Sequence, residues 1–186
     1  MCAIKTFLKP EGIAAPSHAT MYLDVASYNF DENELAKKHF EGNEYRKIVW
    51  LEHCKSDYLL SNDHTSIKTF DFTDRNLRSP LDGDGFASDF EILVAKADIL
   101  NAFIGSFDTK LCDEVFLNTM PKYPATHWKQ SIFFIAKPIQ VEKGDIIEGK
   151  LHIKTLEENH QDLLVSLIFK VKGKKGSESV ELFTFE

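Results

Sequence analysis

The stretch Leu163-Leu164-Val165-Ser166-Leu167-Ile168-Phe169-Lys170-Val171 decides the fold class of this protein. Its odd-numbered positions are all apolar, whereas its even-numbered positions mix apolar and polar side chains. A repeat of two residues is typical of a β-strand that buries one face. The stretch Gly173-Lys174-Lys175-Gly176 follows and predicts a turn, so residues 180–185 are expected to return as the second strand of a terminal hairpin.

Similar patterns predict strands along most of the chain. They fall at residues 19–26, 67–72, 90–95, 99–107, 114–117, 131–141 and around 151–154. Only residues 31–40 favour a helix, with Asp31 as its N-cap and Glu34 three residues later. Many short strands with turn signals between them indicate a mainly β fold, and we expect an antiparallel β-barrel with one short helical arm insertion.

Length, charge and cysteine content restrict the class of protein. The 186 residues, of which 43% are hydrophobic and 27% charged, suit one globular domain. The net charge of −7 and the small number of arginines argue against nucleic acid and against an anionic membrane as partners. Cys2, Cys54 and Cys112 form neither a metal motif nor a disulfide framework, which favours a reducing compartment. The N-terminal apolar run is too short for a signal peptide, so a cytoplasmic or nuclear location is expected.

Acidic residues gather between Asp71 and Asp98, where seven carboxylates accompany three basic residues. This stretch is either a solvated, charged loop or a surface that attracts basic peptides. Its Asp82-Gly83-Asp84-Gly85 turn does not fit a calcium loop, because that loop needs a carboxylate at the position of Leu93. It does not fit a dinucleotide site either, because no strand precedes it and no helix follows it. The seven histidines show no metal-ligand spacing.

The loop ahead of the strand at 131–141 carries the most informative side chains. Two prolines hold this loop extended, and it delivers Thr126, His127 and Trp128 to the start of the strand. Trp128 can lie against a guanidinium or ammonium group through a cation–π attraction of about 0.5–2 kcal/mol. His127 can bond a carboxylate and so fix a neighbouring element. The alternative is that Trp128 is a core aromatic residue and His127 its satisfied polar neighbour.

The strings Thr119-Met120-Pro121 and Thr126-His127-Trp128-Lys129-Gln130 resemble the Thr-His-Trp loop of the type I protein arginine methyltransferases. Further similarities follow in the order of that family, at Phe133-Phe134, Pro138, Val141, Gly144-Asp145, Gly149 and Asp162-Leu163. Upstream, the stretch from the methyl-donor domain of the family into its barrel resembles Leu8-Lys9-Pro10-Glu11-Gly12 and Ala19-Thr20-Met21-Tyr22. The resemblance therefore covers nearly the whole chain.

This resemblance implies a domain organisation. Residues 1–18 would be a remnant of the connection from a methyl-donor domain. Residues 19–186 would be a β-barrel that binds substrate and dimerises, with an arm-like insertion at about 28–61. The arm region lacks the aromatic-glycine pattern of the family, and Ser17-His18 stands where the family shows an acidic–basic pair.

The resemblance also implies an activity, which is S-adenosylmethionine-dependent methyl transfer to the guanidinium group of protein arginines. Thr126, His127 and Trp128 would be the substrate-binding residues, with Trp128 in the wall of the arginine pocket and His127 bonded to an acidic residue of the catalytic half. The implied partners are protein substrates with arginine-rich basic segments. A homo- or hetero-oligomer with a methyltransferase is also implied.

Two features of the family do not occur in these residues, namely the glycine-rich donor-binding motif and the loop with two glutamates that holds the target guanidinium. Those carboxylates position the arginine nitrogen for attack on the sulfonium methyl group. We therefore expect no catalytic residue and no bound cofactor in this chain, with S-adenosylmethionine implied only for the family. The chain alone is expected to be inactive.

Three hypotheses remain open from the sequence. The first is the substrate-binding and dimerisation barrel of an arginine methyltransferase. The alternative, from another class, is a non-catalytic interaction or regulatory module that pairs with a complete arginine methyltransferase. The third is an unrelated β-barrel binding protein, which a position of Thr126–Trp128 away from any cleft would support.

Overall fold

The computed structural model describes residues 9, 11–41, 49–74, 81, 83–156 and 162–185. Strands dominate these ranges, and they contain one α-helix, so the mainly β prediction is confirmed. The helical elements are the short 3-10 helices η1 (Phe30–Glu32) and η3 (Ser56–Tyr58) and the α-helix α2 (Glu34–Glu41). The strands are β1 (His18–Ala26), β2 (Trp50–Glu52), β3 (Thr65–Asp71), β4 (Phe86–Leu93), β5 (Asp98–Cys112), β6 (Val115–Asn118), β7 (Gln130–Val141), β8 (Ile146–Thr155), β9 (Leu163–Val171) and β10 (Ser179–Phe185).

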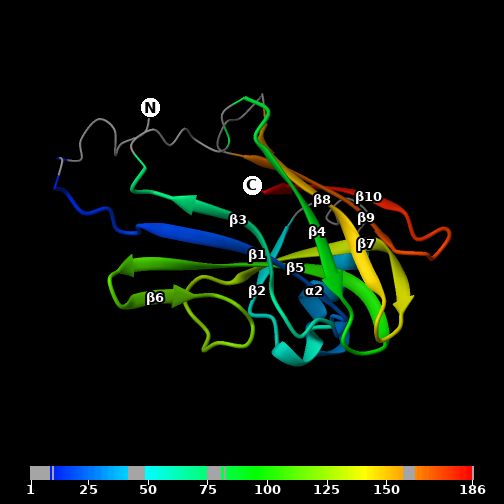
Figure 1. The fold of residues 1–186 in the computed structure, drawn as a ribbon. Helices are drawn as coiled ribbons and strands as arrows, with labels where there is room; N and C mark the ends of the chain where they lie inside the picture. The colour runs from blue at the N-terminus through cyan, green and yellow to red at the C-terminus, as the bar shows by residue number, and fades with distance from the viewer. Residues whose placement is uncertain are drawn as a thin grey trace.

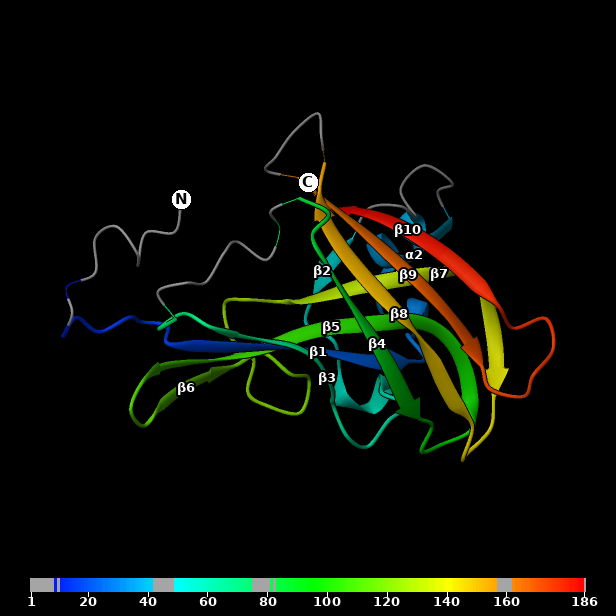
Figure 2. The same cartoon turned by 45° about the horizontal axis from the view of Figure 1, so that its top comes forward.

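Antiparallel pairing arranges these strands in two sheets (Figure 1). The large sheet has the order β2-β7-β5-β1-β3, and β6 folds back onto the far end of β5. The small sheet has the order β10-β9-β8-β4. Figure 2 shows the strands of the small sheet crossing over β5 and β7, so the two sheets lie face to face. This packing buries one face of each sheet.

The core between the sheets explains the alternation seen in β9. The odd-numbered residues of that strand are directed at the large sheet, and Val165, Leu167 and Phe169 are almost completely buried. The rings of Phe103 and Phe169 meet edge to face, with centroids 4.8 Å apart. Such aromatic pairs add about 0.5–1.5 kcal/mol to the stabilisation from buried area. We call this cluster the inter-sheet core.

A second core covers the opposite face of the large sheet. It packs Tyr28 and Ala36, from the segment that follows β1, against Ala102, Ile104 and Phe134 of the sheet. We call this cluster the arm core, and the segment 28–61 the arm. Ala36 lies on α2 and is fully buried, so the helix is held by its small apolar face. The large sheet is therefore buried on both of its faces.

The expected closed barrel is not confirmed, because the described strands pair as two separate sheets. Hydrogen bonds outside the strand pairing instead bridge the two gaps between the sheets, and some of them come from side chains. On one side the hydroxyl of Ser88 donates to the backbone oxygen of Ile67 at 2.8 Å. On the other side the backbone N–H of Ala136 donates to the Glu181 carboxylate at 3.1 Å.

Most of the predicted strands are confirmed, with changes at their ends. The strand predicted at 90–95 is β4, which begins earlier, at Phe86, because the turn ends at Gly85 with a positive φ of 75°. The strand predicted at 99–107 extends to Cys112 in β5. Strand β2 was not predicted, because three residues are too few to show a periodic pattern.

The predicted N-cap of the helix is wrong. Asp31 lies in η1, and the α-helix begins only at Glu34. The cap is Asn33, whose side-chain oxygen accepts hydrogen bonds from the backbone N–H groups of Leu35 at 3.1 Å and Ala36 at 3.0 Å. Asparagine and aspartate serve equally well as N-caps, so the sequence alone could not separate two candidates two positions apart.

Candidate functional site

The loop between β6 and β7, residues 119–129, carries the three predicted site residues. It starts from a fixed point, because Thr119 is 2% exposed and tied to β5. The backbone N–H of Thr119 donates to the carbonyl of Phe107 at 2.9 Å, and the N–H of Phe107 donates to the Thr119 hydroxyl at 2.9 Å. We call residues 119–129 the substrate loop, because they include the three residues to which the family resemblance assigns substrate binding.

Thr126, His127 and Trp128 lie together at the far end of this loop. The Thr126 hydroxyl donates to the backbone oxygen of Trp128 at 2.8 Å and so folds the loop back at this position. The ring of Trp128 meets that of Phe107 edge to face, with centroids 6.5 Å apart, and that of His127 at 6.4 Å. Trp128 is 53% exposed, so the alternative that it is a core aromatic residue is wrong.

His127 and Trp128 line a cavity of about 620 Å³ to which both sheets contribute. Its wall is mostly apolar and aromatic, and none of its lining residues is an aspartate or a glutamate. From the large sheet come Ala19, Met21, Tyr22, Leu23, Leu51, Ile67, Phe70, Gly105, Ser106, Phe107, Ser131 and Phe133, and from the small sheet Leu151, Ile153 and Phe185. The cavity can therefore hold the apolar stem and the flat face of a side chain, but it offers no counter-charge to a cation.

Tyr22 adds a polar group to the wall of this cavity. Its hydroxyl donates to the Asp108 carboxylate at 2.8 Å. Burial, and then the bond to Asp108, raises the pKa of Tyr22, so the phenol stays protonated well above neutral pH. The hydroxyl of Ser106 is buried nearby and has no hydrogen-bond partner among the described residues.

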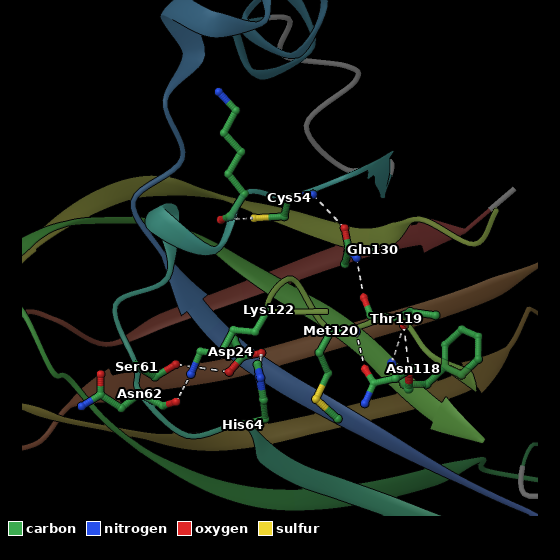
Figure 3. A network of polar contacts seen from close by, with 12 residues as sticks. Asp24, Cys54, Ser61, Asn62, His64, Asn118, Thr119, Met120, Lys122 and Gln130 are labelled. Carbon is green, nitrogen blue, oxygen red and sulfur yellow. Dashed lines mark hydrogen bonds and ion pairs between the residues drawn. The ribbon is translucent and has the colours of Figure 1, made fainter. Parts of the chain in front are cut away.

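Gln130 is the last residue of the quoted Thr126–Gln130 string, and it does not line the cavity. Its side chain is buried between the substrate loop and the end of the arm (Figure 3). The amide oxygen accepts a hydrogen bond from the backbone N–H of Cys54 at 2.7 Å. The amide nitrogen donates to the backbone oxygen of Thr119. One side chain therefore contacts both ends of the substrate loop and the arm.

A buried carboxylate lies close to this network. Asp24 is completely buried in β1 and bonds the Ser61 hydroxyl at 3.2 Å and the Nδ1 atom of His64 at 2.7 Å (Figure 3). Burial, and then the charge of Asp24, raises the pKa of the Cys54 thiol to about 12. Cys54 is therefore a neutral, unreactive thiol at physiological pH. Cys54 and Cys112 are both free cysteines.

Sequence reasoning missed the roles of Gln130, Asp24 and His64. Gln130 contacts Cys54, which is 76 positions away, and Thr119, which is 11 positions away, and Asp24 is 40 positions from His64. No pattern of neighbouring residues reports these pairs. Asp24 left no signal, because a polar residue between Leu23 and Val25 is the ordinary alternation of a strand with one exposed face. Within the acidic stretch from 71 to 98, Asp89 and Glu91 of β4 form ion pairs. Residues 75–80 and 82 of this stretch lie outside the described residues.

Neither a metal centre nor a membrane span emerges from the described part of the chain. Within it, no three histidine, cysteine, aspartate or glutamate side chains gather in a way that could hold a metal ion. The helices of the same ranges are all too short or too polar to cross a bilayer.

Comparison with known proteins identifies the family. Residues 18–174 match the family model of the arginine methyltransferase oligomerization subdomain. This chain belongs to the arginine methyltransferase family. The match includes the substrate loop and the whole of the arm, and it confirms the resemblance drawn from the Thr-His-Trp string.

Relatives within the arginine methyltransferase family cover nearly all of the chain. Protein arginine N-methyltransferase 1 of Dictyostelium discoideum is 28% identical over 192 residues, which cover 94% of this chain and 54% of that protein. The protein of the same name in Schizosaccharomyces pombe is 27% identical over 174 residues, or 88% of this chain and 50% of that protein. The chain thus spans about half the length of the curated relatives it matches.

Solved structures of arginine methyltransferases show the same fold. The PRMT1 enzyme-prozyme heterotetrameric complex of Trypanosoma brucei with AdoHcy contains a chain that superposes with a TM-score of 0.83 at 18% identity, over 100% of this chain and 62% of that one. Arabidopsis thaliana protein arginine methyltransferase 10, in a uniquely open conformation, superposes with a TM-score of 0.78 at 22% identity, over 96% of this chain and 62% of that one. At these identities the likeness establishes the arrangement of the strands.

Proposed function

We propose that this chain is the substrate-binding and dimerisation part of a type I protein arginine N-methyltransferase, which transfers methyl groups from S-adenosylmethionine to arginine guanidinium groups of proteins. The observation that carries the proposal is the position of Trp128, which is half-exposed beside an apolar cavity in a loop with the Thr-His-Trp string. Membership of the arginine methyltransferase family supports the same reaction.

Trp128 is proposed to form one wall of the arginine pocket. A guanidinium group is planar and weakly hydrated, so it stacks on an indole ring, a contact that contributes about 0.5–2 kcal/mol. The aliphatic stem of the arginine would lie against apolar residues of the cavity such as Phe107 and Met21. This arrangement selects a flat cation with a long apolar stem.

The counter-charge for the guanidinium is proposed to come from a catalytic half with the two family glutamates. The support is that no carboxylate lines the cavity beside Trp128. His127 is exposed and makes no hydrogen bond with the described residues, so both of its ring nitrogens can meet an acidic residue of that half. Thr126 has a supporting role, because its hydroxyl holds the backbone at Trp128.

The domain boundaries expected from the sequence are retained in this proposal. Residues 1–18 would connect to a methyl-donor domain, and residues 19–186 would act as one barrel-like unit, with the two sheets joined through Ser88 and Glu181. The arm would mediate oligomerisation, in keeping with the description of the family model. Leu35 supports this role, because it is 67% exposed on α2 and so presents an apolar side chain to a partner.

The methyl donor is proposed to be bound outside this chain. The Trypanosoma brucei complex contains AdoHcy, the product that S-adenosylmethionine leaves after methyl transfer, and this supports S-adenosylmethionine as the donor of the assembled enzyme. The 186-residue chain on its own is accordingly expected to bind an arginine-rich peptide without methylating it.

A second candidate is a regulatory module that pairs with a complete arginine methyltransferase. The supporting observation is the structural similarity to a chain of a complex in which an enzyme and a prozyme assemble as a heterotetramer. In this case the arm would bind the complete enzyme, and the substrate loop would adjust which peptides that enzyme accepts.

Both candidates are tested by one methylation assay. The chain is incubated with S-[methyl-³H]adenosylmethionine and an Arg-Gly-rich peptide, with and without a full-length arginine methyltransferase. The proposal expects no label transfer by the chain alone and measurable peptide binding by calorimetry. Label transfer by the chain alone would overturn it. A change in the rate or the oligomeric state of the full-length enzyme favours the regulatory module, and no change in either excludes that module.

A further inference from the structure

Gln130 lies where the substrate loop, the arm and strand β7 meet (Figure 3). We propose that Gln130 is a positioning residue that links the arm to the substrate loop, so that a displacement of the arm is transmitted to Trp128. This inference deepens the proposed function and rests on it, because it assigns the substrate loop a role in peptide binding.

On the loop side, Gln130 closes the neck of the loop. Its amide nitrogen donates to the backbone oxygen of Thr119, which is eleven positions earlier in the chain. Thr119 is in turn fixed to Phe107 through both its backbone and its hydroxyl. The two ends of the substrate loop are thus held together by a side chain, whereas the loop tip at Trp128 is half-exposed.

On the arm side, Gln130 is joined in two ways to β2 and to the residues that follow it. Its amide oxygen accepts from the N–H of Cys54 at 2.7 Å, and its backbone lies opposite Glu52 in the pairing of β2 with β7. Glu52 also accepts a hydrogen bond from the side chain of Asn33 at 2.8 Å. Because Asn33 is the N-cap of α2, a continuous series of contacts leads from the helix through β2 to Gln130.

Burial makes this link stiff. Gln130 is 4% exposed, so no water competes for its amide group. A movement that broke either bond would leave the buried Cys54 N–H or the Thr119 carbonyl without a partner, and such unpaired groups are strongly disfavoured. The three segments therefore shift together more readily than they separate.

A labelled chain tests this link directly. The protein contains two tryptophans, Trp50 on β2 and Trp128 on the loop, so 5-fluorotryptophan gives one ¹⁹F resonance for each region, assigned with Trp128→Phe. Asn33→Ala removes the helix cap and the bond to Glu52 without touching the loop. We expect this change to shift both resonances.

Asn33→Ala introduced into a Gln130→Met chain completes a double-mutant cycle. Methionine keeps the length of glutamine and removes both hydrogen bonds. Asn33→Ala should then shift the resonance of Trp50 and leave that of Trp128 unchanged. The matched control is Gln140→Met, on the exposed end of β7, which should preserve the response of both resonances.

A second variant keeps the inference falsifiable if Gln130→Met does not fold. Gln130→Glu can still accept from Cys54, but at neutral pH its carboxylate faces the Thr119 oxygen and cannot donate. Protonation restores that donor, so the Trp128 resonance of Gln130→Glu should return toward the wild-type position as the pH falls from 7.5 to 5. Gln140→Glu should show no such return.

Two outcomes overturn the inference. In the first, Asn33→Ala does not shift the Trp128 resonance of the otherwise wild-type chain. In the second, Asn33→Ala still shifts that resonance in the Gln130→Met chain. Peptide binding is measured separately, by calorimetry with the Arg-Gly-rich peptide. If Asn33→Ala leaves the Trp128 resonance unchanged in the otherwise wild-type chain and that chain still binds the peptide, only the role of Gln130 is contradicted. Intact coupling in a chain that does not bind the peptide contradicts the proposed function.

Discussion

The carboxylate of Asp24 lies 2.7 Å from Nδ1 of His64, although the two residues are 40 positions apart and Asp24 is completely buried. The pair joins the C-terminal part of β1 to the segment that returns from the arm, and Ser61 adds a second bond to the same carboxylate. If one partner of a buried carboxylate is removed, the charge remains in an environment that cannot solvate it. The pair therefore holds the returning segment against the large sheet.

Replacing His64 by Leu should destabilise the chain strongly. The carboxylate of Asp24 would keep only the Ser61 hydroxyl, so we expect a loss of about 2–4 kcal/mol in the free energy of unfolding, measured by urea denaturation. The control is Lys150→Leu, which removes the partner of the exposed Asp89 and should change stability by less than about 1 kcal/mol. Equal effects of the two substitutions would show that burial of Asp24 is not decisive.

Cys54 lowers the stability of the fold at alkaline pH. Burial raises the pKa of its thiol from 9.0 to about 12, so the folded state retains a proton that the unfolded state releases. This stabilising contribution is complete below pH 9 and is lost as the pH rises toward 12. At pH 10 the loss should reach about 1.5 kcal/mol.

The contribution of Cys54 is measured as the drop in unfolding free energy between pH 7 and pH 10, with Cys54→Ala for comparison. The drop should be smaller in Cys54→Ala, although that variant is less stable at pH 7 because it loses buried volume. Cys112→Ala is the matched control, since its thiol is exposed and should leave the drop unchanged. Identical drops in all three proteins would refute the assignment to Cys54.

Gly149 should not tolerate a side chain. A Cβ atom at this position of β8 would overlap the backbone oxygen of Ile168 and lie 2.6 Å from the ring of Phe90. We expect Gly149→Ala to lower the midpoint of thermal unfolding, with a loss of about 1–3 kcal/mol. In Gly105→Ala the new Cβ would lie 3.1 Å from the ring of Phe133, which can turn away, so a smaller loss is expected. The reverse order of the two losses would contradict this account.

Trp128→Ala should weaken peptide binding without unfolding the protein. Because Trp128 is 53% exposed, its removal should cost less than about 1 kcal/mol of stability, whereas the lost cation–π contact should raise the Kd of an Arg-Gly-rich peptide by about 2- to 30-fold. Tyr123→Ala is the control, since Tyr123 is equally exposed on the same loop and does not line the cavity. A cooperative loss of structure in Trp128→Ala would show that the ring is part of the core.

The strands could be predicted because their alternation is local. In β9 the buried odd-numbered residues are visible in the sequence itself, and the observed bounds Leu163–Val171 coincide with the quoted stretch. Family membership could be predicted for the same reason, since Thr126 to Gln130 is a continuous string. Local patterns are thus sufficient for the element type and for the family.

Contacts between distant segments could not be predicted. Gln130 was noticed only as the end of a motif, because its partners Cys54 and Thr119 are brought to it by the pairing of β2 and β7 and by the return of the loop. The barrel was expected from the number of strands, yet the sheet edges are joined by contacts such as those of Ser88 and Glu181, which no strand pattern reports.

The two buried faces of the large sheet give adjacent residues different constraints. In β5 and β7, Phe103 and Phe133 belong to the inter-sheet core, while their neighbours Ile104 and Ile132 belong to the arm core. If the arm mediates oligomerisation as proposed, its partner can change through substitutions at Ala102, Ile104, Ile132 and Phe134, which belong to the arm core, while the inter-sheet core stays constant. In that case, diverging copies of this chain would keep the face of the large sheet in the inter-sheet core constant and would differ on the face covered by the arm.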